Sequence, residues 1–226
     1  MKLSDLQPMS KLAKRFGVKS VVYGGPGTGK TPIIVTAPRP IVCVVEPGTL
    51  SARNSSFDTV PAFEANEDSK IKDFFKWICE SNEAKGFDTI GIDSATQMAE
   101  IFLKGELQRN KDGRRAYGEM ARAVKDIFDK LYYLPNKHIY LIAKQGEDDI
   151  TKKKKPYFPG QELNVYVPHL FDEVLQLGFH QIPGQQQPIQ SFKCKESFDA
   201  VARDRSGNLA EFEPPNLTHI FNKCMQ

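Results

Sequence analysis

One short glycine-rich segment constrains the fold of this chain more than any other feature of its sequence. Residues 24–31 read GGPGTGKT, which fits the pattern GxxxxGK[ST] in full. The segment follows the β-branched and aromatic run VVY at 21–23 and precedes a short apolar run that ends before Pro38. A loop of this kind between a strand and a helix predicts an α/β fold built around a parallel sheet.

The residue types in this segment suit the binding of phosphate groups. Glycines let backbone N–H groups approach phosphate oxygens without side-chain clashes, and the helix that follows points its positive N-terminus at the same oxygens. A lysine supplies a cation for the β- and γ-phosphates, and a threonine hydroxyl is a ligand for Mg²⁺. The sequence therefore predicts that ATP and Mg²⁺ are bound by Gly24, Gly25, Pro26, Gly27, Thr28, Gly29, Lys30 and Thr31.

Pro32 follows this loop directly and is unusual there. A proline is harmless in the first turn of a helix, where the missing N–H has no intrahelical acceptor. The missing donor does, however, remove one backbone contact that a phosphate could otherwise use.

Apolar patterns along the chain predict strands that alternate with helices through the first 145 residues. Continuous or β-branched runs predict strands over residues 19–23, 41–45, 89–92, 138–143, 174–179, 189–194 and 200–203. Helical spacing and breakers predict helices over residues 10–16, 30–36, 69–80 and 117–134. Residues 146–167 show no clear period and are expected to form a functional or mobile loop. We expect a single domain over residues 1–226, with a mostly parallel sheet, helices on both faces and some antiparallel C-terminal strands.

Two carboxylates follow predicted buried strands. Asp93 stands at the end of the strand at 89–92, where it can hold the Mg²⁺ shell through water. Ser94 occupies the place of a following glutamate, so the best candidate for a base is Glu46, after the strand at 41–45. The plainer alternatives are a helix-capping aspartate and a solvated turn glutamate.

These residues, in this order, resemble the RecA-like ATPases. In that family a glutamate follows the strand after the P-loop helix, the next motif ends Asp-Ser, and a later strand ends in a glutamine that senses the γ-phosphate. The corresponding residues are Glu46, Asp93 with Ser94, and Gln145. The chain is most similar to small phage proteins with only the RecA core, which include the Sak-four group of single-strand annealing ATPases. FDEVLQL at 171–177 and ARDRSGNL at 202–209 resemble the C-terminal half of that group.

The resemblance implies a RecA-like P-loop NTPase core that hydrolyses ATP, binds single-stranded DNA and promotes strand annealing or pairing in phage recombination. It also implies a homo-oligomer, as a ring or filament, and a single-strand DNA-binding protein as partner. RecA-like cores place basic C-terminal residues near the nucleotide of the next protomer, and here these are Arg203 and Arg205. Two surface arginines in a hairpin are the plainer alternative.

In RecA-like proteins two loops bind DNA, and in this sequence basic residues occupy both positions, at 104–115 and 147–163. The first carries Lys104, Arg109, Lys111, Arg114 and Arg115, and the second carries Lys152, Lys153, Lys154, Lys155, Tyr157 and Phe158. Basic side chains neutralise phosphates, and aromatic rings stack on unpaired bases. Because four adjacent lysines repel one another, we expect the second segment to stay mobile until a polyanion binds. A solvated loop is the alternative.

Composition excludes several other classes of protein. The net charge is only +3, and no apolar run is long enough to cross a bilayer. The first 16 residues have no signal-peptide pattern, so a cytoplasmic protein (in the host cytoplasm, if phage-encoded) is expected. The four cysteines form no CxxC pair, which argues against a metal site made by protein ligands alone. A P-loop small-molecule kinase, with Arg203 and Arg205 in a lid, and a nucleotide-gated interaction module with little turnover remain alternative functions.

Overall fold

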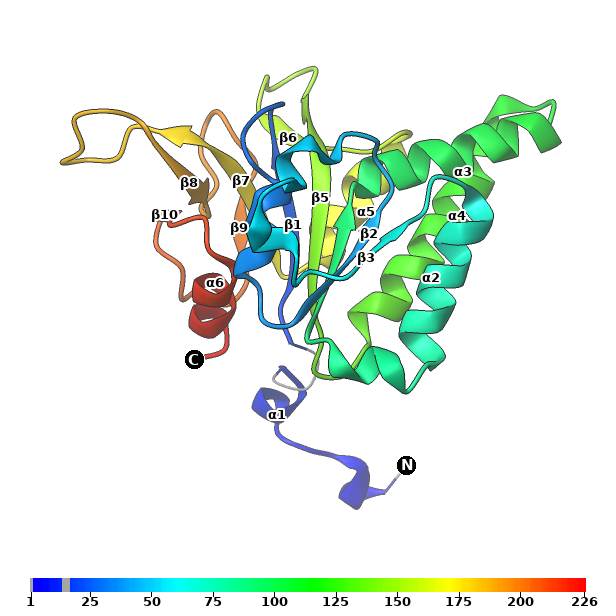
Figure 1. The fold of residues 1–226 in the computed structure, drawn as a ribbon, viewed down its shortest axis with the longest axis horizontal. Coiled ribbons are helices and arrows are strands. Elements are labelled where there is room, and N and C mark those ends of the chain that lie inside the picture. Colours follow the sequence, from blue (N-terminus) through cyan, green and yellow to red (C-terminus); the bar gives the residue numbers. More distant parts are fainter. Residues whose placement is uncertain (1, 14–16) are drawn as a thin grey trace.

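One ten-stranded sheet organises the chain (Figure 1). The computed structural model describes residues 2–13 and 17–226. The strands are β1 (Lys19–Gly24), β2 (Pro40–Val44), β3 (Ala62–Glu64), β4 (Thr89–Asp93), β5 (His138–Glu147), β6 (Lys154–Tyr157), β7 (Glu173–His180), β8 (Ile189–Lys193), β9 (Arg203–Asp204) and β10 (Phe212–Glu213). The strand order is β10-β8-β7-β1-β5-β4-β2-β3, with β6 paired to β5 and β9 paired to β7.

The centre of this sheet is parallel and its later strands are antiparallel. The strands from β7 to β3 in the spatial order pair in parallel throughout. The strands β6, β8, β9 and β10 pair antiparallel with their neighbours. The predicted mostly parallel sheet with antiparallel C-terminal strands is therefore confirmed.

Helices cover both faces of the sheet. The α-helices are α1 (Met9–Ala13), α2 (Asp68–Glu80), α3 (Ala95–Arg109), α4 (Gly113–Tyr132), α5 (Gln161–Leu170) and α6 (Leu217–Cys224). Short 3₁₀ helices are η1 (Leu3–Asp5), η2 (Thr31–Thr36), η3 (Thr49–Ala52), η4 (Ser55–Phe57) and η5 (Glu83–Gly86). None of these described helices is long and apolar enough to cross a membrane.

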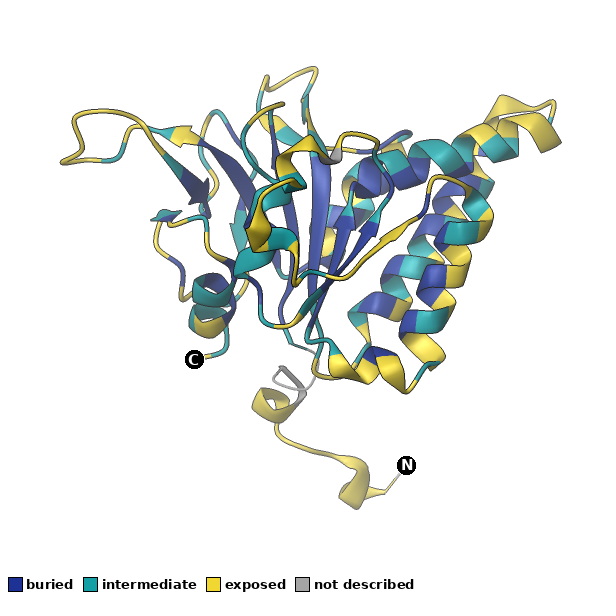
Figure 2. Ribbon diagram, viewed as in Figure 1, coloured by how far each residue is buried: buried dark blue, intermediate teal, exposed yellow. Residues whose placement is uncertain are grey.

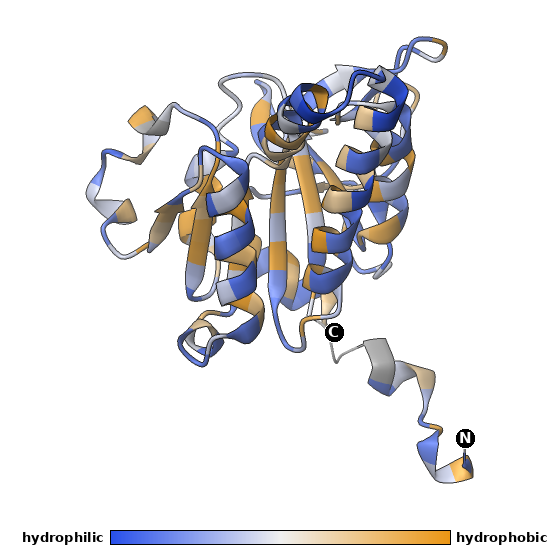
Figure 3. Ribbon diagram, turned by 90° about the vertical axis from the view of Figure 1, so that its right-hand side faces the viewer, coloured by the Kyte–Doolittle hydropathy of each residue, from blue (hydrophilic) through white to orange (hydrophobic). Residues whose placement is uncertain are grey.

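The parallel strands other than the exposed edge strand β3 bury side chains on both of their faces, as β1 illustrates. Val21 and Tyr23 belong to a core shared with α2, α3, α4 and α5, whereas Val22 belongs to a second core with η2 and α6. Figure 2 shows these strands buried between the helices, and Figure 3 shows hydrophobic strands beneath helices with hydrophilic outer faces. Burial on both faces explains why the strands read as continuous apolar runs.

Two predicted loops are regular structure instead. The expected loop at 104–115 is helical, because α3 continues to Arg109 and α4 begins at Gly113, leaving a turn at residues 110–112. Asp112 caps α4 by accepting a hydrogen bond from the Arg114 N–H at 2.9 Å. The expected loop at 146–167 forms the antiparallel β5–β6 hairpin and most of α5.

The predicted helix at 10–16 corresponds to α1, and its last three residues lie outside the described residues. A single domain over residues 1–226 stays a prediction.

Candidate nucleotide-binding site

The glycine-rich loop lies at the carboxyl end of the central strand. β1 ends at Gly24, and η2 begins at Thr31. Gly27 has φ 74° and Gly29 has φ 81°, in the left-handed region that favours glycine. A Cβ at Gly24 would lie 2.4 Å from the backbone carbonyl oxygen of Leu177, so close packing requires a glycine at the start of the loop. The loop therefore keeps its shape through its glycines, with Pro32 in the first turn of the helix that follows.

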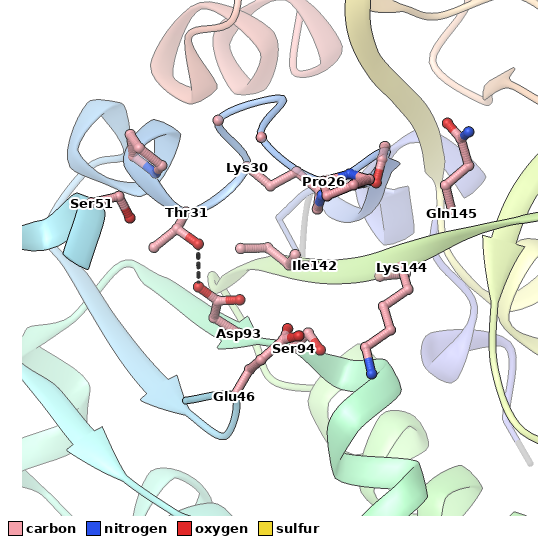
Figure 4. Close-up of a pocket in the computed structure, with 15 residues that line it drawn as sticks. Pro26, Lys30, Thr31, Glu46, Ser51, Asp93, Ser94, Ile142, Lys144 and Gln145 are labelled. Atoms are coloured by element: carbon pink, nitrogen blue, oxygen red, sulfur yellow. Dashed lines mark hydrogen bonds between the residues drawn. The ribbon is translucent and has the colours of Figure 1, made fainter. Parts of the chain in front are cut away.

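A cavity of about 690 Å³ lies against this loop and collects residues from four strands or strand ends (Figure 4). The loop contributes Gly24, Pro26, Gly27, Gly29, Lys30 and Thr31. Glu46, Asp93 and Gln145, which lie far apart in the sequence, line the same cavity. They meet because β1, β5, β4 and β2 are adjacent and their carboxyl ends share one edge of the sheet. Of the predicted loop residues, Gly25 and Thr28 line a neighbouring cavity instead.

Thr31 and Asp93 form the oxygen-rich part of this site. The Thr31 hydroxyl donates to Asp93 Oδ2 at 2.5 Å. Burial raises the pKa of Asp93 above its usual value, the Thr31 hydroxyl opposes this, and the nearby Glu46 adds to the rise. A hydroxyl and a carboxylate are hard oxygen donors of the kind that Mg²⁺ binds beside phosphates and water. Among the described residues no cluster of three or more His, Cys, Asp or Glu side chains forms a metal site. This donor set fits a Mg²⁺ ion that takes its remaining ligands from a nucleotide and water.

Lys30 lies folded over the loop that precedes it. Its ammonium donates to the carbonyl oxygens of Gly24 at 2.8 Å and Gly25 at 2.9 Å. Burial lowers the pKa of Lys30, and the carboxylates of Asp93 and Glu46 oppose this effect. Phosphate oxygens are stronger acceptors than carbonyls for an ammonium group. The position suits a cation that exchanges loop carbonyls for nucleotide phosphates.

Glu46 reaches the cavity through a fixed backbone. Its N–H and that of Val45 donate to the carbonyl of Asp93, at 3.0 and 2.6 Å. These bonds tie the end of β2 to the end of β4 and place Glu46 beside Asp93 and Ser94 (Figure 4). Within the described part of the chain, no hydrogen bond or ion pair engages the Glu46 carboxylate. The carboxylate is available to accept a proton from a water molecule in the cavity.

Three residues that sequence reasoning missed also contact or line this site. Gln190 on β8 donates its side-chain amide to the Thr28 carbonyl at 2.6 Å. Tyr140 on β5 donates its hydroxyl to the Lys30 carbonyl at 2.8 Å. Lys144 on β5 lines the cavity and binds Glu100 at 2.9 Å. No local sequence signal marks the first two, because their contacts join residues more than a hundred positions apart.

Most of the lysine run in the second basic segment is paired with carboxylates. Lys152 lies 3.9 Å from Glu147, Lys153 lies 2.6 Å from Glu196, and Lys155 lies 2.9 Å from Asp148. Asp148 also accepts hydrogen bonds from Thr151, and together these donors hold the pKa of its carboxyl well below its usual range. Three of the four lysines thus have carboxylate partners, and that the segment stays mobile until a polyanion binds remains a prediction.

The exposed part of this segment is narrower than predicted. Lys154 is exposed, and among the described residues it has no ion pair. Tyr157 is 42% exposed, but Phe158 is fully buried and its ring packs against Phe128 at 6.3 Å. Side chains alternate at the end of β6, so Tyr157 points outward and Phe158, the residue after the strand, points inward. The prediction that Phe158 stacks on bases is therefore wrong.

The first basic segment is a helical corner. Lys104 is exposed on α3 and lines a separate groove, and Arg109 binds Glu106 at 2.6 Å and Asp68 at 3.4 Å. Lys111, Arg114 and Arg115 are exposed at the turn and the start of α4. Cations are thus displayed on the surface of two helix ends rather than on a flexible loop.

Arg203 and Arg205 lie far from the nucleotide cavity of their own chain. Arg203 begins β9, which pairs with the first residues of β7, so both arginines lie at the sheet edge opposite the P-loop. Arg203 donates to the Pro168 carbonyl at 3.0 Å, and Arg205 binds Asp172 at 2.8 Å. A role across a subunit interface stays a prediction.

Comparisons with known proteins agree with this architecture. Residues 17–206 match the model of a protein family described as AAA domain. No curated protein matches the chain. An ATPase from the type III secretion system of pathogenic bacteria is 13% identical, with a TM-score of 0.50, over 75% of this chain and 55% of that one. The chain thus spans little more than half of that ATPase, and such a likeness shows the fold alone.

Two further solved structures are similar over most of their length. A KaiC-like protein from the archaeon Pyrococcus horikoshii is 14% identical, with a TM-score of 0.46, over 88% of this chain and 82% of that one. The RadB recombinase is 14% identical, with a TM-score of 0.48, over 79% of this chain and 81% of that one. With the parallel strand order and the P-loop at the end of β1, the predicted RecA-like P-loop fold is confirmed.

Proposed function

The chain belongs to the AAA domain family, and we propose that it hydrolyses ATP and that single-stranded DNA stimulates this activity during strand annealing or pairing. One observation carries the ATPase part of the proposal. The P-loop, Asp93, Glu46 and Gln145 line a single cavity although they come from separate parts of the sequence. A loop, a metal-binding pair and a free carboxylate in one place are the groups that ATP hydrolysis requires.

Each residue has a distinct task in this proposal. Loop N–H groups and Lys30 bind the phosphates, and Thr31 and Asp93 hold Mg²⁺, which supplies charge neutralisation when it is bound. Glu46 accepts a proton from water as the water oxygen bonds to the γ-phosphorus. The bond from the γ-phosphorus to the bridging oxygen breaks, which leaves ADP and inorganic phosphate. Gln145 uses its side-chain amide to sense the γ-phosphate.

The DNA part of the proposal rests on exposed cations near the same edge of the sheet. The α3–α4 turn and the β5–β6 hairpin both extend from the end of the molecule that carries the P-loop (Figure 1). The first displays Lys111, Arg114 and Arg115, and the second displays Lys154 and Tyr157. Cations of this kind bind the phosphates of a single strand with little sequence preference.

We extend the proposal to a homo-oligomer, as a ring or filament, that works with a single-strand DNA-binding protein in the cytoplasm of a phage host. In such an assembly Arg203 or Arg205 would act on the γ-phosphate of the neighbouring protomer. Mixing Lys30→Ala subunits with Arg203→Ala/Arg205→Ala subunits tests this, because shared sites restore some activity. No recovery at any mixing ratio contradicts it.

Release of inorganic phosphate from ATP, with and without single-stranded DNA, tests the central proposal. We expect turnover that rises when DNA is added. Turnover that ignores DNA contradicts the DNA-dependent part, and binding without turnover favours a nucleotide-gated interaction module. Transfer of the phosphoryl group to a small acceptor instead of water indicates a kinase.

A further inference from the structure

A second cavity, of about 610 Å³, lies directly beside the P-loop. Gly25 and Thr28 of the loop form one of its walls, and the carboxyl end of β7 forms another. Gln145 lines both this cavity and the nucleotide cavity. The two cavities therefore share the loop and one amide side chain, so a ligand in the second cavity would lie next to a bound nucleotide.

Two aromatic side chains at this cavity are exposed. Phe179, near the end of β7, is 65% exposed, and Phe198, in the segment after β8, is 90% exposed. Neither ring stacks on another aromatic ring in the described part of the chain. By contrast, Phe212 at the same cavity packs against His180 at 5.2 Å and lies under Lys193. Two free aromatic faces at one cavity are a stacking surface for unpaired bases.

Charge at the rim suits a polyanion. Lys154 lines this cavity and is the member of the lysine run that has no ion pair among the described residues. The carboxylate of Asp199, also at the cavity, is already neutralised by Lys193 at 2.8 Å. Because Asp199 is already paired, it does not compensate the charge of Lys154, and a phosphate group of a ligand would.

The remaining polar groups favour bases over one fixed small ligand. Gln145 and Gln181 present amides in the wall of the cavity, and the Gln181 amide nitrogen donates to the Gln185 carbonyl at 2.7 Å. The Gln145 amide has no hydrogen-bond partner among the described residues and can rotate to meet the edge of any base, which gives binding without strong sequence preference. This combination of aromatic faces, an unpaired cation and amides suits single-stranded nucleic acid, in which every nucleotide carries a planar base. It suits an acidic peptide less well, because most peptide residues carry no planar ring.

We propose that this cavity binds single-stranded nucleic acid, with Phe179 and Phe198 stacking on successive bases and Lys154 contacting a phosphate. The inference rests on the proposed DNA-dependent function. It assigns the bound nucleic acid to a site that lies mostly outside the two basic segments predicted from the sequence. Only Lys154 is common to this site and to the segments predicted from the sequence.

Fluorescence anisotropy of labelled oligo(dT) and oligo(U) tests the site in the parent chain, in Phe179→Ala/Phe198→Ala and in the control Phe63→Ala. Phe63 is 40% exposed on β3, at the other end of the sheet. We expect the double variant to bind at least about tenfold more weakly, and the control to bind like the parent. Phe198→Trp should retain most of the affinity. Lys154→Ala should lower the salt slope, which is the steepness of the fall of log affinity with log salt concentration, by about 0.7. Comparison of the two oligonucleotides distinguishes DNA from RNA.

The outcomes separate this inference from the proposed function. If the parent and the double variant bind both oligonucleotides equally tightly, the site is wrong while the DNA-dependent function stands. If the parent binds neither oligonucleotide, both are wrong. If the double variant keeps its affinity but loses self-association in a size measurement, the aromatic pair belongs to a protein interface and the inference is overturned. Unchanged ATP affinity in the double variant confirms that its fold is intact.

Discussion

The nucleotide cavity and the β5–β6 hairpin lie near the same edge of the sheet, but different interactions hold them. In the cavity, Glu46 and Asp93 are fixed by buried neighbouring strands whose ends are joined by two backbone hydrogen bonds. In the hairpin, the direction of each lysine depends on surface carboxylates such as Glu196, which lies 43 positions away from Lys153. Residues at strand ends are therefore placed by the fold itself, whereas a run of like charges is placed by partners that its own pattern does not reveal.

The largest expected effect separates the two regions. Lys30→Ala should abolish productive ATP binding and leave DNA binding without nucleotide unchanged, because the ammonium contacts only the loop and no core residue. Titration with a fluorescent ATP analogue, beside a thermal melt, measures this. Equal affinity for ATP in the variant and the parent would contradict the assignment of the P-loop as the ATP-binding site.

Glu46→Gln tests the chemistry within the cavity. The substitution keeps the size of the side chain and removes the base, so kcat should fall by about 10²-fold or more while the affinity for ATP stays close to that of the parent. Steady-state phosphate release and nucleotide titration give the two numbers. Normal turnover would mean that another group activates the water.

Gln190→Ala tests a contact that links the antiparallel part of the sheet to the P-loop. Loss of one hydrogen bond to the Thr28 carbonyl should raise the KM for ATP by about 2- to 10-fold, with little change in kcat. Gln187→Ala, in the exposed turn before β8, is the matched control. A variant whose KM equals that of the control would show that the loop holds its shape without Gln190.

The smallest expected effect concerns the lysine run. If all four lysines contacted phosphates, replacing them with alanine would lower the salt slope for DNA binding by about three units. Because Lys152, Lys153 and Lys155 have carboxylate partners, we expect Lys154→Ala alone to account for most of the change, about 0.7 unit. A log–log salt titration of oligo(dT) affinity measures both slopes. A full three-unit loss in the quadruple variant would show that the ion pairs exchange for phosphate.

The sequence allowed correct prediction of residues that depend on strand order and failed for those that depend on tertiary contacts. Glu46 and Asp93 could be predicted to meet, because each follows a predicted strand with a clear apolar run, and the resemblance to the RecA-like ATPases added Gln145. The burial of Phe158 could not, since it depends on packing against Phe128 of α4. Gln190 carries no motif, and its contact with the P-loop depends on the strand order β8-β7-β1.

The helical corner between α3 and α4 was missed for a related reason. The buried residues of α3 lie in its first half, up to Phe102, so its second half shows no apolar stripe. Basic residues there resembled a loop, although propensity alone allows a helix to continue through them. Neighbouring α2 and α4 support this half through contacts such as that of Arg109 with Asp68.

Calorimetric titration of the parent chain with ATP, in the presence and absence of Mg²⁺, tests the central claim most directly. The cavity predicts one ATP per chain, bound more tightly with Mg²⁺ because Thr31 and Asp93 then contribute to binding the ion. Binding that is absent at millimolar ATP, or that is indifferent to Mg²⁺, would contradict the assignment of this cavity as a Mg²⁺–ATP site.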